Sequence, residues 1–195
     1  KIALNYSLEN MLSGYDLSKA AVYLENGYRL AKAVQSRYYV AKYHHIRATL
    51  LTSQSQYDEA FAACDTAIAA SEQLMQAKKT DSYTVERCRA DIAQTLVTKG
   101  LICAKQYKYN ESIQYYLQSI GLFEAINNPG NNSSVAHIYT SVSSNYYELE
   151  QFDDALIYDK MALPYLSKEQ NIDLFVIGYL FVADDYSSLS KFDSS

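Results

Sequence analysis

Gln56-Tyr57-Asp58-Glu59-Ala60 is the stretch that decides the fold, because variants of it recur along the chain. Each copy has an aromatic or apolar residue, then acidic or polar residues, then a small residue. The small residues are 40, 52, 43 and 40 residues apart, at Ala20, Ala60, Ser112, Ala155 and Ser195. Recurrence at a period of 20 to 50 residues is typical of stacked helical repeats. The sequence therefore predicts an all-α protein built from helix pairs.

The composition agrees with long helices in a folded protein. The chain has 195 residues, of which 49% are hydrophobic and 20% charged. Two prolines and six glycines leave few helix breaks. We expect helices over about 2–12 and 17–33, 38–53 and 57–76, 83–105 and 109–126, 134–149 and 152–166, and 172–189. Thr80 or Asp81 is expected to cap one helix, and Ser133 or Ser134 another.

Charge and cysteine content exclude several classes of function. The net charge is −5 and no basic stripe is visible, which argues against nucleic-acid binding and anionic membranes. Cys64, Cys88 and Cys103 form no Cys-x-x-Cys pair and are expected to be buried, inert thiols. His44 is expected in the core. We see no nucleophile–base pair, phosphate loop or metal set, so we expect no enzyme, cofactor or metal.

The repeated phrases resemble the tetratricopeptide repeat. Its pattern of small and aromatic positions is matched by three full units, namely His44, Ala48, Leu51, Tyr57, Ala60, Cys64 and Ala67; Leu96, Gly100, Cys103, Tyr109, Ser112, Tyr116 and Ser119; and Tyr139, Ser143, Tyr146, Phe152, Ala155, Asp159 and Ala162. A weaker first copy contains Leu4, Leu8 and Met11, and a fifth copy is cut off. Asp159 stands where the family has an aromatic residue. The resemblance implies a right-handed α-α superhelix of about four and a half pairs.

We expect one repeat domain over 1–195, with units near 1–36, 37–79, 80–130, 131–170 and 171–195. Periods of 40 to 43 residues exceed the family's usual period of about 34 and look like long-repeat bacterial regulators. The composition looks most like repeat regions from Bacteroidetes that are attached to sensor kinases or LuxR-type regulators. Since the chain starts with Lys1 and stops inside a copy, we expect a segment of a longer regulator. Its compartment is open, whether cytoplasmic or periplasmic.

In such a stack the first helix of each pair lines a concave groove, which suits extended peptides or partner helices. Equivalent outward positions predict a groove formed by Lys42, His45, Thr49, Gln94, Leu101, His137, Thr140, Ser144, Tyr147 and Asp184, with Asn5, Glu9, Val97, Ile177 and Leu180 at matching places. The alternative for each residue is an ordinary solvated helix face.

Two functions remain open at this stage. The first is a non-catalytic module that binds a protein or peptide and serves as the sensory or interaction region of a regulator. The second is a constitutive assembly scaffold for a multiprotein complex. We also expect self-association through the last helix, because Phe175, Val176, Tyr179, Phe181 and Val182 have no covering helix after them.

Overall fold

The computed structural model describes residues 17–126, 128–166 and 172–192. The expected helix over 2–12, with Leu4, Asn5, Leu8, Glu9 and Met11, lies outside the described residues, as does Ser195.

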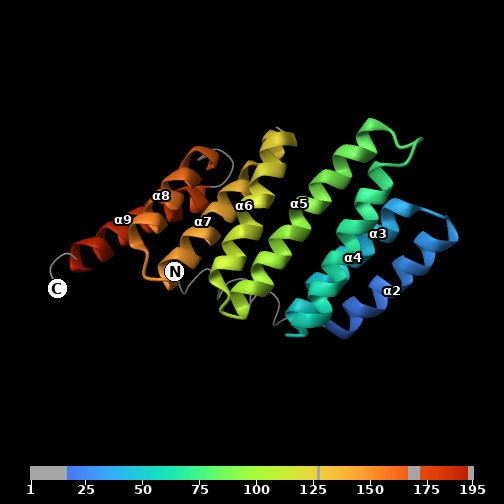
Figure 1. Ribbon diagram of the computed structural model, residues 1–195, viewed down its shortest axis with the longest axis horizontal. Helices are drawn as coiled ribbons and strands as arrows, with labels where there is room; N and C mark the ends of the chain where they lie inside the picture. The colour runs from blue at the N-terminus through green and yellow to red at the C-terminus, as the bar shows by residue number, and fades with distance from the viewer. Residues whose placement is uncertain (1–16, 127, 167–171, 193–195) are drawn as a thin grey trace. The chain divides into compact units, whose positions relative to one another are not determined.

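The described residues form α-helices joined by short turns, and no strand occurs among them (Figure 1). The α-helices are α2 (Leu17–Ala33), α3 (Arg37–Ser53), α4 (Tyr57–Met75), α5 (Ser82–Lys105), α6 (Tyr109–Ile126), α7 (Asn132–Glu148), α8 (Phe152–Ala162) and α9 (Ile172–Phe192). Two 3₁₀ turns, η1 (Pro129–Asn131) and η2 (Leu163–Tyr165), precede α7 and follow α8. The all-helical class and the expected order of helices over 17–192 are confirmed.

The chain divides into two compact units, residues 1–102 and 103–195, and the division falls within α5. In the first unit α3 packs against α2 and α4, and in the second α7 packs against α6 and α8 while α9 packs against α8. Consecutive helices are thus packed in series within each unit. The expectation of one continuous repeat domain stays a prediction.

The turns inside the helix pairs share one backbone geometry. Ser55, Tyr107 and Glu150 have φ angles of 59°, 61° and 60°, in the left-handed region that residues with a side chain rarely adopt. Each is followed by a residue whose N–H bonds back to the carbonyl five positions earlier, as in Gln151 to Tyr146 at 2.9 Å. This is a Schellman cap, which satisfies the last carbonyls of a helix and reverses the chain. Gln35 makes the same turn between α2 and α3.

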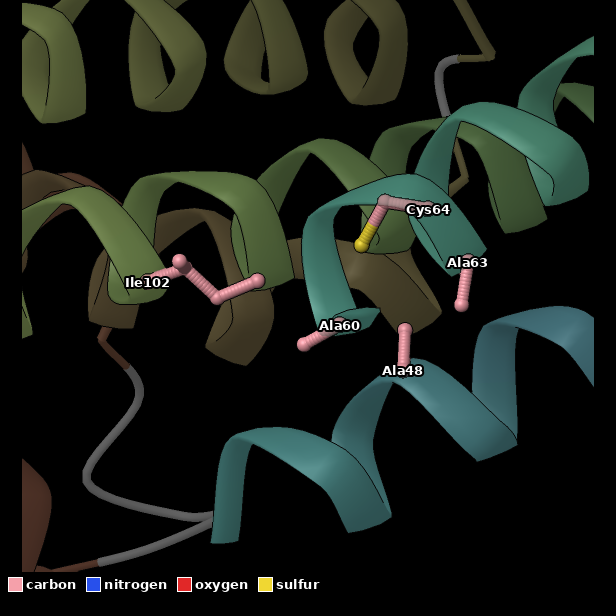
Figure 2. Packing of buried hydrophobic residues seen from close by; sticks show 5 residues of the cluster. All are labelled: Ala48, Ala60, Ala63, Cys64 and Ile102. Atoms are coloured by element: carbon pink, nitrogen blue, oxygen red, sulfur yellow. The ribbon is translucent and has the colours of Figure 1, made fainter. Parts of the chain in front are cut away.

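The small residue of the recurring phrase is what allows the helices to pack closely. Ala60, Ser112 and Ala155 have no exposed surface. In the first unit the buried apolar cluster consists of Ala48, Ala60, Ala63, Cys64 and Ile102 (Figure 2). Four of its five members are small side chains from α3 and α4, and Ile102 of α5 completes it.

In the second unit, tyrosines contribute much of the packing between α7 and α8. The rings of Tyr146 and Tyr158 stack with centroids 5.3 Å apart, and Tyr139 lies 6.3 Å from Tyr158 and 5.7 Å from Tyr165. These four rings connect α7, α8 and η2 in a continuous aromatic series. Asp159, which departs from the tetratricopeptide pattern, is buried on α8.

The cysteines and the helix cap near Thr80 agree with the sequence-based expectations. Cys64, Cys88 and Cys103 are buried and form no disulfide, as expected, and burial raises the pKa of Cys64 to about 12. The expected cap near Thr80 is Asp81, whose carboxylate accepts the Thr84 N–H at 2.8 Å.

Two expectations were wrong in detail. Neither Ser133 nor Ser134 caps α7, because the 3₁₀ turn η1 lets the helix begin earlier, at Asn132. His44 is half-buried beside Tyr28 and Tyr43 and does not lie deep in the core.

Candidate functional site

Two polar contacts join α3 to α5, the first helices of successive pairs. The ammonium group of Lys42 pairs with the carboxylate of Asp91. One turn further along α3, the Nδ1 atom of His45 lies 3.0 Å from the Thr95 hydroxyl. We call these four residues the α3–α5 contact. Because α4 separates the two helices in sequence, the contact brings together segments that are about fifty residues apart.

His45 was expected to face the groove, and the structure places it inside the α3–α5 contact with 9% of its surface exposed. Burial lowers the pKa of His45 to about 4; nearby Lys42 acts in the same direction and Asp91 opposes it. The imidazole is therefore neutral near pH 7 and hydrogen-bonds to Thr95. The expectation failed because α5 packs over this turn of α3, which helix periodicity alone does not report.

The other expected residues of the first unit are more accessible. Lys42 is partly exposed although it is paired. Thr49 and Gln94 are exposed, and Leu101 is 39% exposed. The Thr49 hydroxyl donates to the His45 carbonyl at 3.3 Å, which leaves its oxygen able to accept. We call Thr49, Gln94 and Leu101 the exposed row: Thr49 follows His45 by one turn of α3, and Gln94 and Leu101 are about two turns apart on α5.

The expected residues of the second unit lie on α7, apart from Asp184 on α9. His137 and Asp184 are exposed, and Thr140, Ser144 and Tyr147 are partly exposed. The Thr140 hydroxyl donates to the His137 carbonyl, and the Ser144 hydroxyl donates to the Thr140 carbonyl, both at 2.9 Å. Tyr147 packs edge-on against Phe152 with centroids 5.1 Å apart. The α7 face therefore offers hydroxyl acceptors and an aromatic ring.

Three polar residues of α5 that were not predicted make contacts with neighbouring helices. Asp91 and Thr95 complete the α3–α5 contact. Buried Lys99 donates to Asp65 at 2.6 Å and lies over the Phe61 ring at 4.2 Å. The sequence did contain a sign of Lys99, because this charged residue stands beside Gly100, one of the positions that match the repeat pattern. For Asp91 and Thr95 the pairing depends on long-range packing that no local pattern encodes.

The described ranges contain no group of three or more His, Cys, Asp or Glu side chains arranged to hold a metal ion. Over those same ranges, none of the helices has both the length and the apolar character needed to span a bilayer.

Comparison with known proteins shows a likeness in fold to solved structures. No family model matches the chain, and no curated protein matches it either. Among solved structures the chain is similar to the crystal structure of BtubC (BKLC) from P. vanneervenii, with a TM-score of 0.52 and 14% sequence identity over 91% of this chain and 84% of that chain. At that identity the likeness shows the fold alone, and the site residues must be judged by their own chemistry.

Proposed function

We propose that the chain is a non-catalytic tetratricopeptide-type module that binds an extended peptide or partner helix on the face formed by the first helices of its pairs. In this proposal the pairs continue as a right-handed superhelix. The module then serves as the sensory or interaction region of a larger bacterial regulator. The observation that carries the proposal is the α3–α5 contact, since it sets two first helices side by side while residues of the exposed row on both helices stay exposed.

The chemistry of that face suits a peptide backbone with mixed side chains. In the first unit the Thr49 hydroxyl donates its proton to a helix carbonyl, and in the second unit the hydroxyls of Thr140 and Ser144 do the same. Within each unit these oxygens are therefore left as acceptors for backbone N–H groups. Leu101 offers apolar surface about two turns along α5 from the polar Gln94. Peptide grooves commonly combine main-chain hydrogen bonds with a few side-chain contacts.

The test begins with a random peptide library displayed on phage and selected against the immobilised protein. Fluorescence anisotropy then measures the affinity of a selected peptide for Leu101→Asp and for Leu117→Asp. The two leucines are matched, at 39% and 37% exposed, but Leu117 lies on α6, the second helix of its pair. We expect Leu101→Asp to weaken binding at least about tenfold and Leu117→Asp to leave it unchanged. Equal losses of peptide affinity in the two variants would contradict the proposal, as would a library from which no peptide can be selected.

The second function, a constitutive assembly scaffold, predicts a different outcome. A scaffold would hold one partner at fixed stoichiometry through purification and would select no short peptide. The resemblance to regulators also predicts that the parent gene encodes a kinase, receiver or DNA-binding region beside this segment.

We also propose self-association through α9. Val176, Tyr179, Leu180 and Tyr186 each have about half or more of their surface exposed on this helix, whereas Phe181 and Val182 are partly buried. The side chain of Phe175 lies outside the described residues. Sedimentation velocity should show a concentration-dependent dimer that Leu180→Asp abolishes. A monomer at every concentration contradicts this part of the proposal.

A further inference from the structure

A cavity of about 410 Å³ lies in the second unit where α6 ends and α7 begins. It is separate from the exposed row and from the residues expected to form the groove. Its lining includes Phe123, Glu124, Asn128, Asn131, Asn132 and Tyr165. The described lining therefore includes one carboxylate, three carboxamides and two aromatic rings.

The carboxylate of Glu124 is held in place by two tyrosine hydroxyls. Tyr165 donates to Oε1 at 2.7 Å and Tyr139 donates to the same oxygen at 3.2 Å. The hydrogen bond to Glu124 raises the pKa of Tyr165, and burial raises that of Tyr139, so both hydroxyls remain protonated donors. Because both hydroxyls engage Oε1, Oε2 is the oxygen that a ligand in the cavity would use.

The backbone around the cavity disfavours an anion. The N-termini of helices bind anions through exposed N–H groups. Here three consecutive N–H groups already donate hydrogen bonds within the protein. Gly130 donates to Asn128 Oδ1 at 2.9 Å, Asn131 donates to the Asn128 carbonyl at 2.8 Å, and Asn132 donates to the Pro129 carbonyl.

The charge of the cavity points to a cation. Glu124 lies in the last turn of α6, where the helix dipole is negative, and the described residues of the lining include no Lys, Arg or His. Side-chain oxygens of Asn131 and Asn132 add neutral acceptors, and the rings of Phe123 and Tyr165 offer faces that attract cations.

We propose that this cavity binds a guanidinium or ammonium group, with the carboxylate of Glu124 as its counter-ion. Tyr139 and Tyr165 orient that carboxylate, and the ring of Phe123 forms one wall of the site. The group can come from a basic side chain of a peptide or from a free amine. This site does not depend on the proposed groove.

The experiment uses a matched pair of probes on the intact chain. Nα-acetyl-arginine amide carries the guanidinium, and Nα-acetyl-citrulline amide has nearly the same shape without the charge. Two-dimensional ¹H–¹⁵N NMR titrations should show saturable shifts for the arginine probe at Gly130 and at the Asn128, Asn131 and Asn132 side chains. We expect the citrulline probe to bind at least about tenfold more weakly. Agmatine, titrated in the same way, tells whether a free amine suffices or a peptide backbone is needed.

Two variants locate the interaction. Glu124→Gln should abolish the arginine shifts, and Glu111→Gln, an exposed glutamate at the other end of α6, should leave them unchanged. The wild-type comparison of the two probes stands even if Glu124→Gln folds poorly. Equal affinity for arginine and citrulline, shifts confined to other residues, or full binding by folded Glu124→Gln each overturn the proposal.

Discussion

The side-chain amide of Asn145 donates a hydrogen bond to the hydroxyl of Ser112 at 2.7 Å, and both residues are buried between α6 and α7. In the first unit the same two repeat positions hold Ala60 and Ile102, which belong to the apolar cluster of Figure 2. The contact between the second helix of one pair and the first helix of the next pair is thus apolar in the first unit and polar in the second. A buried polar pair stabilises only while both partners are present.

Removing one member of this pair should be costly. Ser112→Ala leaves the amide of Asn145 without this acceptor, and we expect a loss of about 1–3 kcal/mol in the free energy of unfolding. Adding Asn145→Leu removes the amide as well and should recover about 1 kcal/mol of that loss. Recovery stays partial because Ser112 also hydrogen-bonds to the Tyr116 hydroxyl. Urea unfolding of the two single variants and the double variant measures the coupling. Strictly additive losses would contradict the account of this contact.

The left-handed turn at Glu150 gives a test of backbone strain. Glu150 is exposed, so its substitution changes mainly the cost of a φ angle of 60°. Glu150→Gly should raise the free energy of unfolding by up to about 1 kcal/mol, because glycine adopts this region freely. Glu150→Val should lower it by about 1–2 kcal/mol, since a β-branched residue is strained there. Thermal unfolding of both variants measures the difference, and equal effects would show that the turn does not limit stability.

The close packing of α9 against η2 can be tested by adding a methyl group at Gly178. A methyl group at Gly178 would lie 2.5 Å from Leu166 Cδ1 and 3.2 Å from Leu163 Cδ2, whereas one at Gly121 meets nothing within 4 Å. We expect Gly121→Ala to stabilise by about 1 kcal/mol through helix propensity. Gly178→Ala should be less stable than Gly121→Ala by about 1–3 kcal/mol, because Leu166 must move. Differential scanning calorimetry compares the two variants, and equal gains would mean that the packing is looser than described.

The buried imidazole of His45 predicts a dependence of stability on pH. Its pKa is lowered from 6.5 to about 4, so the unfolded chain takes up this proton first as the pH falls. The stability that the neutral imidazole contributes is fully present above pH 6.5 and is lost as the pH falls towards 4. The loss reaches up to about 3 kcal/mol.

His45→Gln should remove this component while keeping a side chain that can hydrogen-bond to Thr95. The carboxylates and His44 titrate in both proteins, and burial also lowers the pKa of His44. The difference between the two stability curves therefore isolates His45. Parallel curves between pH 6.5 and 4 would contradict the buried assignment.

The sequence predicted the helices well because small residues at a fixed repeat position leave few ways to pack. Ala60, Ser112 and Ala155 were identified from the recurring phrase and are all fully buried. The turns were less predictable, since Ser55 and Tyr107 adopt a conformation that normally signals glycine.

The candidate site was only partly predictable. Outward positions follow from helix periodicity, which correctly places Thr49 and Gln94 on exposed surface. Periodicity does not report how near the neighbouring helix comes, so His45 was misplaced and Asp91 was missed. The cavity beside Glu124 depends on Tyr165, forty-one residues later, and no local pattern connects the two.

The most direct test of the binding face is to measure where a bound peptide lies. A peptide selected from the phage library is given a nitroxide label, and paramagnetic broadening of ¹H–¹⁵N resonances is recorded on the intact protein. The account predicts strongest broadening at Thr49, Gln94 and Leu101, on the first helices α3 and α5. Broadening centred instead on the exposed residues of the second helices, such as Thr66 on α4 or Leu117 on α6, would contradict it.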